Sequence, residues 1–135
     1  MTIVVDASVA SRWCFQLTKS DRAEELLRSD HHLIATDLVI AEITTVAWKF
    51  VIFDKMPSEP AAAAVREIVK AFEELVPVSV LRDRAFAIAI ELRHPVYDCF
   101  YLALAERNTS PLVAADERLI RRCADTPFET LVRPL

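Results

Sequence analysis

Short apolar segments, rich in β-branched residues, recur along the chain at intervals that leave room for helices between them. Each is three or four residues long, which is typical of strands that are buried on both faces of a sheet. The predicted strands are Ile3–Val5, Leu33–Ala35, Val78–Val80, Leu112–Ala115 and Phe128–Leu131.

Between these segments, apolar residues recur at helical spacing. Ser58 and Pro60 favour the start of a helix, and the apolar positions after them are Val65, Ile68, Val69, Phe72, Leu75 and Val76. Further helices are predicted over Leu38–Phe53, Arg82–Leu92 and Tyr97–Glu106. Helices that alternate with short buried strands form a parallel sheet covered on both faces, so the predicted fold class is α/β.

The length and composition fit one domain that covers residues 1–135. The chain is 53% hydrophobic, which is enough apolar material for one core. The longest apolar runs are too short for a bilayer and the N-terminus has no signal-peptide pattern, so we expect a cytoplasmic protein. Cys14, Cys99 and Cys123 are widely spaced, which favours reduced core thiols over a disulfide framework.

Charge and glycine content exclude several classes of phosphate-binding protein. The net charge of −4 argues against a protein that coats nucleic acid by charge alone, although it allows an enzyme that meets a phosphodiester through metal ions. The chain contains no glycine, so neither a P-loop nor a Gly-rich dinucleotide-binding turn can be present.

Four acidic residues stand in apolar surroundings. Asp6 and Asp116 directly follow predicted strands, at the edge where α/β sheets bind their ligands. Asp98 lies in the first turn of an apolar helix, and Glu42 has Val46 rather than a base four residues further on. Four carboxylates in one pocket would repel each other, and a divalent cation with oxygen ligands, Mg²⁺ or Mn²⁺, would relieve that repulsion.

Each acid also has an interpretation without chemistry. Aspartate is a preferred helix N-cap, so Asp6, Asp98 and Asp116 can each be capping residues, and Glu42 alone can be an ordinary solvated helix residue. A cap leaves one carboxylate oxygen free, so capping and metal binding are compatible. The joint occurrence of all four acids in this order favours a shared site.

The sequence resembles the PIN domain, and more closely the VapC-type toxin ribonucleases of bacterial toxin–antitoxin pairs. The matching segments span nearly the whole chain: IVVDASV at Ile3–Val9, LVIAEITTVAW at Leu38–Trp48, YDCFYLALAE at Tyr97–Glu106 and LVAADERL at Leu112–Leu119. The resemblance implies a three-layer α/β/α sandwich with a short parallel sheet, in which the strands before Asp6 and Asp116 are neighbours.

The resemblance also implies a metal site and a reaction. Asp6, Glu42, Asp98 and Asp116 match the acidic quartet of the family. Asp6 and Asp98 would hold Mg²⁺ or Mn²⁺, Asp116 and Glu42 would act directly or through water, and Ser8 would support the site without touching the metal. The implied activity is that of an endoribonuclease toxin, which hydrolyses RNA phosphodiesters with a metal-activated water.

Three positions depart from the family pattern. The family usually has Thr or Ser where this chain has Ala114, often a proline where it has Thr36, and often an Asn where it has Thr45. Thr36 can cap a helix and Thr45 keeps a polar atom, so these two changes look tolerable. Ala114 loses a hydrogen bond, which puts metal affinity or rate in question.

Two other classes of function stay open. One is a PIN-fold binding module with weakened catalysis, for which Ala114 is the sequence hint. The other is a phosphoacceptor or phosphatase-like α/β domain, which is disfavoured because no aspartate follows Asp6 by two residues and no lysine follows Lys70.

The expected partners are an RNA substrate, a cognate antitoxin protein and a second copy of the chain. Candidate phosphate contacts are Arg12, Lys49, Arg118 and Arg121. The resemblance implies an antitoxin in an apolar groove, for which Trp13–Phe15 and Trp48–Phe53 offer aromatic side chains, and the same apolar surplus predicts a homodimer. For the histidines we expect surface roles rather than zinc binding: His31, His32 and His94.

Overall fold

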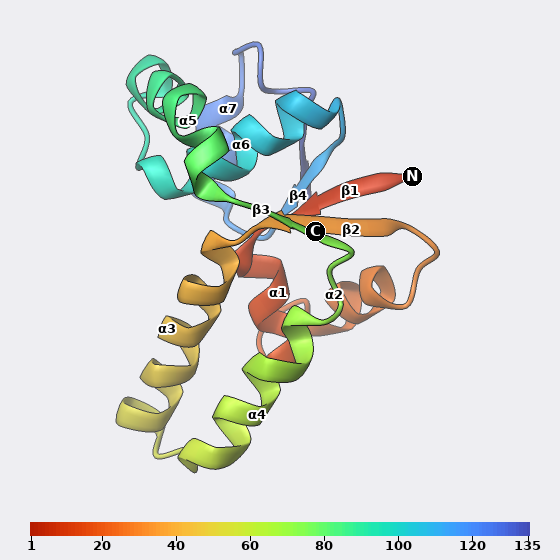
Figure 1. The fold of residues 1–135 in the computed structure, drawn as a ribbon, viewed down its shortest axis with the longest axis vertical. Coiled ribbons are helices and arrows are strands. Elements are labelled where there is room, and N and C mark those ends of the chain that lie inside the picture. Colours follow the sequence, from red (N-terminus) through yellow and green to blue (C-terminus); the bar gives the residue numbers. More distant parts are fainter.

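The computed structural model describes residues 1–135 and contains a five-stranded parallel sheet between two layers of helices (Figure 1). The strand order is β3-β2-β1-β4-β5, and every neighbouring pair is parallel. This confirms the predicted α/β class and places the strands before Asp6 and Asp116 side by side. The strands are β1 (Thr2–Val5), β2 (His32–Thr36), β3 (Glu74–Val76), β4 (Leu112–Ala114) and β5 (Val132–Pro134).

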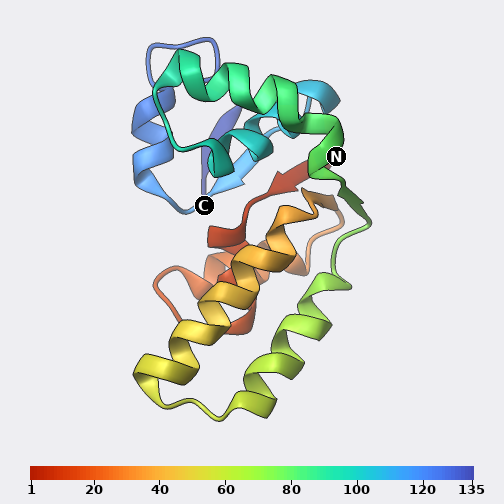
Figure 2. The same ribbon diagram turned by 60° about the vertical axis from the view of Figure 1, so that its left-hand side comes forward.

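Seven helices cover the two faces of the sheet. In Figure 1, α1 (Ala7–Cys14), α2 (Ser20–Leu27), α3 (Leu38–Asp54) and α4 (Ser58–Val69) lie below the sheet. The upper layer consists of α5 (Val78–Leu92), α6 (Val96–Asn108) and α7 (Glu117–Cys123). Figure 2 shows α3 and α4 as an antiparallel pair that extends away from the sheet as an arm. None of these helices combines the length and the apolar character that crossing a membrane requires.

The boundaries around β3 differ from those predicted. The helix after Ser58 ends at Val69. Leu75 and Val76 continue its helical spacing in the sequence, but they belong to the strand β3. The predicted strand at Val78–Val80 is wrong, because these residues form the first turn of α5. The preceding Pro77 is extended and has no backbone N–H to donate, so the strand ends before it and the helix starts after it.

Two further elements escaped the sequence pattern. The predicted strand at Phe128–Leu131 is wrong, since β5 starts at Val132 and Phe128 instead fills the core from a turn. Helix α2 was not predicted, because only two of its eight residues, Ser20 and Ala23, are buried. A helix with so narrow a buried face leaves little apolar periodicity in the sequence.

The course of the chain creates a crevice between β1 and β4. From β1 the chain proceeds outward to β2 and β3, then crosses to the other side of β1 to form β4 and β5. The connections leaving β1 and β4 therefore diverge toward opposite layers, and open α/β sheets bind their ligands at such a point. Asp6 directly follows β1, and Asp116 follows β4 after one intervening residue, Ala115.

The turn between α5 and α6 brings further polar residues to this crevice. Arg93 ends α5 in a left-handed conformation, with φ 51°, and its N–H bonds to the carbonyls of Ala89 and Ile90. His94 follows, and Pro95 precedes the first residue of α6. The fixed φ of proline and the bonded end of α5 hold this short turn in place.

Candidate active site

An open cleft of about 670 Å³ lies where β4 ends, and three of the four candidate acids line it: Glu42, Asp98 and Asp116. Asp6 does not line the cleft, because its side chain is buried, with 3% of the residue exposed. It is nevertheless close enough to Asp98 and Glu42 for their charges to raise its pKa. The fold thus gathers acids from the starts of α1, α6 and α7 and from the body of α3.

Asp6 is both a helix cap and a buried acid. Its Oδ1 accepts hydrogen bonds from the Val9 N–H at 3.1 Å and from the Ser8 hydroxyl at 2.6 Å. Burial is the main cause that raises the pKa of Asp6 from 3.8 to about 7, and the charges of Asp98 and Glu42 add to it. No hydrogen bond reaches Oδ2, so this oxygen is free to bind a ligand.

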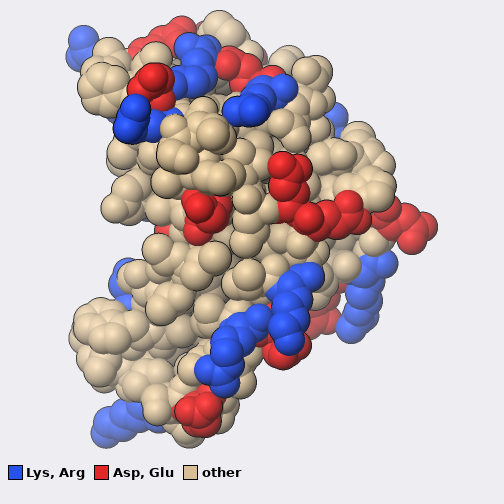
Figure 3. All heavy atoms as spheres, in the orientation of Figure 1, with Lys and Arg blue, Asp and Glu red and all other residues tan.

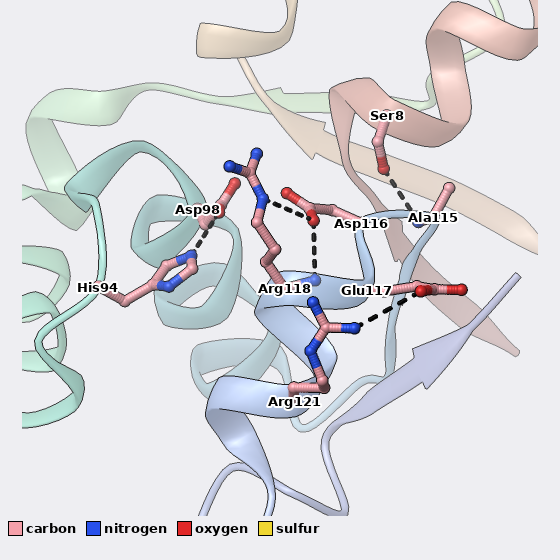
Figure 4. A network of polar contacts seen from close by, with 8 residues as sticks. All are labelled: Ser8, His94, Asp98, Ala115, Asp116, Glu117, Arg118 and Arg121. Atoms are coloured by element: carbon pink, nitrogen blue, oxygen red, sulfur yellow. Dashed lines mark hydrogen bonds and ion pairs between the residues drawn. The ribbon is translucent and has the colours of Figure 1, made fainter.

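Ser8 connects the two strand ends. Its hydroxyl donates to Asp6 and accepts a hydrogen bond of 2.9 Å from the Ala115 N–H (Figure 4). This hydroxyl therefore holds the segment before Asp116 against the segment after β1. Ala114 is buried and its methyl group offers no hydrogen bond, so the side-chain connection from this segment to the Asp6 carboxylate runs through Ser8.

Glu42 is held by a residue that the sequence did not single out. The buried Tyr101 of α6 donates its hydroxyl to Glu42 Oε1 at 2.7 Å. Burial raises the pKa of Glu42, the Tyr101 hydrogen bond opposes that rise, and the charge of Asp98 adds to it. Tyr101 lies one turn after Asp98, and that spacing of three on an apolar helix was the available signal.

The expectation of a surface role is wrong for His94. Its side chain is 9% exposed, and its Nε2 lies 2.6 Å from Asp98 Oδ2 (Figure 4). An ionised carboxylate can only accept, so Nε2 carries the proton in this contact. His94 and Asp98 are four residues apart, a spacing that brings side chains together within a helix. Because Pro95 lies between them, the sequence places His94 in a loop and gives no sign of this contact.

Asp116 also combines capping with a place in the cleft. Its Oδ1 accepts from the Arg118 N–H at 2.9 Å at the start of α7, and the Arg118 guanidinium lies 3.5 Å from the same oxygen. Figure 4 shows Asp98, Asp116 and Arg118 turned toward the same space. Arg118 is 81% exposed, so its attraction for Asp116 is strongly screened by water.

The four candidate phosphate contacts fall in three different places. Arg118 and Arg121 line the cleft with the acids. Lys49 lines a second hollow of about 310 Å³, which shares Glu42 with the first. Arg12 lies in neither hollow, because its guanidinium donates to the carbonyls of Ser8 and Thr18. Arg12 thus has a structural role that its sequence position did not reveal.

The donor set has the chemistry that Mg²⁺ and Mn²⁺ favour. The cleft presents carboxylate oxygens, which are hard ligands, and the repulsion felt by Asp6 is what a cation would relieve. No three His, Cys, Asp or Glu side chains lie close enough together to hold a metal ion in this geometry. Mg²⁺ commonly keeps several waters and uses only one or two carboxylates, so this more open arrangement still fits it.

Two of the departures from the family pattern prove structurally mild. Thr36 is buried at the end of β2, and its hydroxyl accepts from the Leu38 N–H at 3.4 Å, as α3 begins. Thr45 turns its hydroxyl to the Ala41 carbonyl of its own helix at 2.9 Å. Neither side chain leaves a polar atom buried without a partner.

Only part of the expected aromatic groove is accessible. Trp48, Ile52 and Phe53 of α3 are 54%, 54% and 69% exposed, and together they form what we call the arm face. Figure 3 shows the α3 side of the arm, at lower left, largely free of charged side chains. Phe15 is buried and stacks on Phe50 at 4.7 Å, and Trp13 is half-buried, so the Trp13–Phe15 segment offers less surface to a partner than the arm face does.

The chain belongs to the PIN domain family, whose sequence pattern matches residues 3–125. The parallel sheet with the strand order β3-β2-β1-β4-β5 agrees with this assignment.

The chain is similar to a ribonuclease in sequence and to two VapBC structures in fold. The chain is 31% identical to Ribonuclease VapC3 of Pyrobaculum aerophilum over 137 positions, which cover 99% of this chain and 100% of that protein. VapBC2 from Rickettsia felis, solved with a DNA fragment from its promoter, shares the fold with a TM-score of 0.68 at 10% identity, covering 100% of this chain and 99% of that one. VapBC-5 from Mycobacterium tuberculosis does so with a TM-score of 0.60 at 18% identity, covering 99% and 97%.

Proposed function

We propose that the chain is a Mg²⁺- or Mn²⁺-dependent endoribonuclease, formed by one PIN domain over residues 1–135, and the toxin of a toxin–antitoxin pair in the cytoplasm. The observation that carries the proposal is the convergence of Asp6, Glu42 and Asp98: burial is the main cause that raises the pKa of Asp6, and the charges of Asp98 and Glu42 lie close enough to raise it further. The 31% identity with a ribonuclease, over 99% of this chain, supports RNA as the substrate.

Each acidic side chain has a proposed role in binding the cation or a water. A bound divalent cation would polarise a phosphodiester oxygen and lower the pKa of a water. Asp6 and Asp98 are the proposed ligands, with Glu42 and Asp116 acting directly or through water. Ser8 orients Asp6 through its hydrogen bond.

Three further residues orient the acids or the substrate. Tyr101 orients Glu42 and His94 orients Asp98 through the contacts described above. Arg118, which is largely exposed beside Asp116, is placed to meet a phosphate oxygen of the substrate.

His94 gives a direct test of this orientation. We expect His94→Ala to lower cleavage about 10- to 100-fold, as is usual when a partner of a metal-binding carboxylate is lost. His94→Gln, which can still donate an N–H to Asp98, should recover part of the activity and lower the metal concentration needed for half-maximal rate. His32→Ala is the control, because His32 is exposed and pairs with Glu73. Equal activities of the Ala and Gln variants would contradict the orienting role.

A PIN-fold binding module with weakened catalysis is the second candidate. Ala114 favours it, because the methyl group cannot supply the hydrogen bond that a Thr or Ser would give. Metal-dependent cleavage of RNA by the purified chain separates the two candidates.

The proposed antitoxin would reach the acids along α3. The arm face lies on α3, the helix that also carries Glu42 and Lys49, and these two residues line a hollow together with Ser8. A peptide bound to this face could therefore place a basic side chain against the carboxylates. A separate apolar face on α5 offers a surface for a second copy of the chain: Val80, Phe86 and Ile90 are 54%, 63% and 64% exposed.

Co-expression tests the toxin assignment. We expect the chain alone to arrest growth, and expression with the small reading frame upstream of its gene to restore growth and yield a complex. Phe53→Glu should abolish co-purification while cleavage persists, because it puts a charge on the arm face. Phe86→Glu, on the α5 face, should leave the antitoxin complex intact. A chain that is an active nuclease, yet well tolerated and without a co-purifying partner, would refute the toxin assignment.

A further inference from the structure

We propose that Arg93, Arg121 and Arg122 form a track for the phosphates of single-stranded RNA, leading away from the acids on the side opposite the arm. The inference rests on the proposed ribonuclease function and adds where the substrate lies. In this proposal the three arginines bind the phosphate backbone of the RNA and do not recognise its bases.

The first support is the continuity of two hollows. The acid-lined cleft adjoins a hollow of about 370 Å³, and both are lined by the three arginines of the track. They come from two elements, the turn after α5 and the last part of α7. A strand of RNA with one phosphate at the acids would therefore have its neighbouring phosphates beside these guanidinium groups.

The second support is the charge balance of the track. Arg93 and Arg122 are exposed and form no ion pair, and Arg121 meets only the exposed Glu117, at 3.6 Å. An isolated exposed arginine is usually just solvated. Here, in a chain of net charge −4, three of them gather at one hollow beside the acids. Their positive charge would offset the repulsion between the acidic cleft and a polyanion.

The third support is the absence of aromatic side chains from the hollow of about 370 Å³. Besides the arginines, its lining consists of Glu91, Leu92, Ala124 and Thr126, with no aromatic side chain on which a base could stack. Arginine forks match phosphate oxygens in pairs, whereas sequence recognition of single-stranded RNA relies on stacking and contacts to base edges. The hollow therefore fits the backbone of the RNA rather than its bases.

The test is a double variant, Arg93→Ala with Arg122→Ala, studied in cleavage and binding. We expect KM to rise about tenfold or more with kcat within about twofold, because the track binds substrate and does not touch the reacting bond. Binding of RNA, measured with Asp98→Asn to prevent cleavage, should show a salt dependence of log K that is weaker by about 0.7 for each contact removed. The loss should be equal for RNAs of different sequence.

Two controls sharpen the result. Arg107→Ala removes another exposed arginine without an ion pair, at the far end of α6, and should change neither KM nor the salt dependence. Arg93→Lys with Arg122→Lys keeps both charges and should retain most of the salt dependence.

Distinct outcomes overturn distinct claims. A parent that cleaves RNA, together with a double variant of unchanged KM and salt dependence, overturns the track alone. A loss confined to one RNA sequence, or a loss of antitoxin binding in place of RNA binding, also overturns it. A parent that neither binds nor cleaves RNA overturns the proposed function itself.

Discussion

Replacing Asp98 by Asn is expected to lower RNA cleavage at least ~100-fold while the fold survives. The amide is nearly isosteric with the carboxylate but carries no charge for a divalent cation. Its oxygen can still accept the hydrogen bond from His94, so the start of α6 should keep its geometry. Cleavage would be measured with Mg²⁺ and with Mn²⁺, and folding by thermal denaturation.

Asp83→Asn is a suitable control for this variant. Asp83 lies on the neighbouring helix α5 with its side chain 94% exposed, so neutralising it should leave cleavage unchanged. Full activity of the Asp98 variant would disprove a role for this carboxylate in metal binding. A melting temperature far below that of the parent would instead show that Asp98 serves the fold.

Asp6→Asn is expected to stabilise the metal-free protein at pH 8 while removing cleavage. Burial raises the pKa of Asp6 from 3.8 to about 7, so the group is neutral in both the folded and the unfolded state only at a pH well below 3.8. As the pH rises to about 7, the unfolded chain releases the proton before the folded protein does, and stability falls. Above pH 7 the loss is complete.

The size of the effect follows from the same pKa values. One pKa unit corresponds to about 1.4 kcal/mol, so the rise from 3.8 to about 7 corresponds to a loss of up to about 4 kcal/mol. The asparagine variant is neutral at every pH and can still accept the hydrogen bonds from Ser8 and Val9. Its advantage over the parent should therefore grow between pH 4 and pH 7 and then stay constant.

Urea unfolding in the presence of a chelator would measure this advantage. Asp30→Asn serves as control, because Asp30 is exposed and makes no side-chain hydrogen bond. Adding millimolar Mg²⁺ or Mn²⁺ should stabilise the parent and narrow its gap to the variant, since the cation relieves the repulsion only in the folded state. A difference between variant and parent that does not change with pH would contradict the buried charge.

The elements that could be predicted from sequence are those whose apolar pattern has a single explanation. β1 and α3 are bounded by turn residues and strongly apolar, and both lie within one or two residues of their predicted limits. Val78 and Val80 led to a wrong prediction because β-branched residues favour strands locally. Pro77 and the packing of α5 instead make these residues part of a helix. Local propensity does not contain that packing.

For the candidate site, the sequence could indicate the acids but not the groups that hold them. Asp6 and Asp116 follow strands, and parallel pairing makes such positions neighbours in any sheet of this topology. Tyr101 and His94 contribute through contacts between elements, which depend on how α6 lies against α3 and on the turn before it. Arg93 and Arg122 carry no motif, and only the shape of the surface brings them together.

The pairing of β1 with β4 also determines when the four acids first meet. Val5 pairs with Val113, so nearly the whole chain must be available before the crevice between these strands can close. Contacts so distant in sequence require a large loop-closure entropy to be overcome first, and parallel sheets of this kind fold slowly compared with local hairpins or helices. A nascent chain that ends with α6 contains Asp6, Glu42 and Asp98 but not Asp116. All four acids can therefore come together only after Asp116 has been synthesised and β4 has paired with β1.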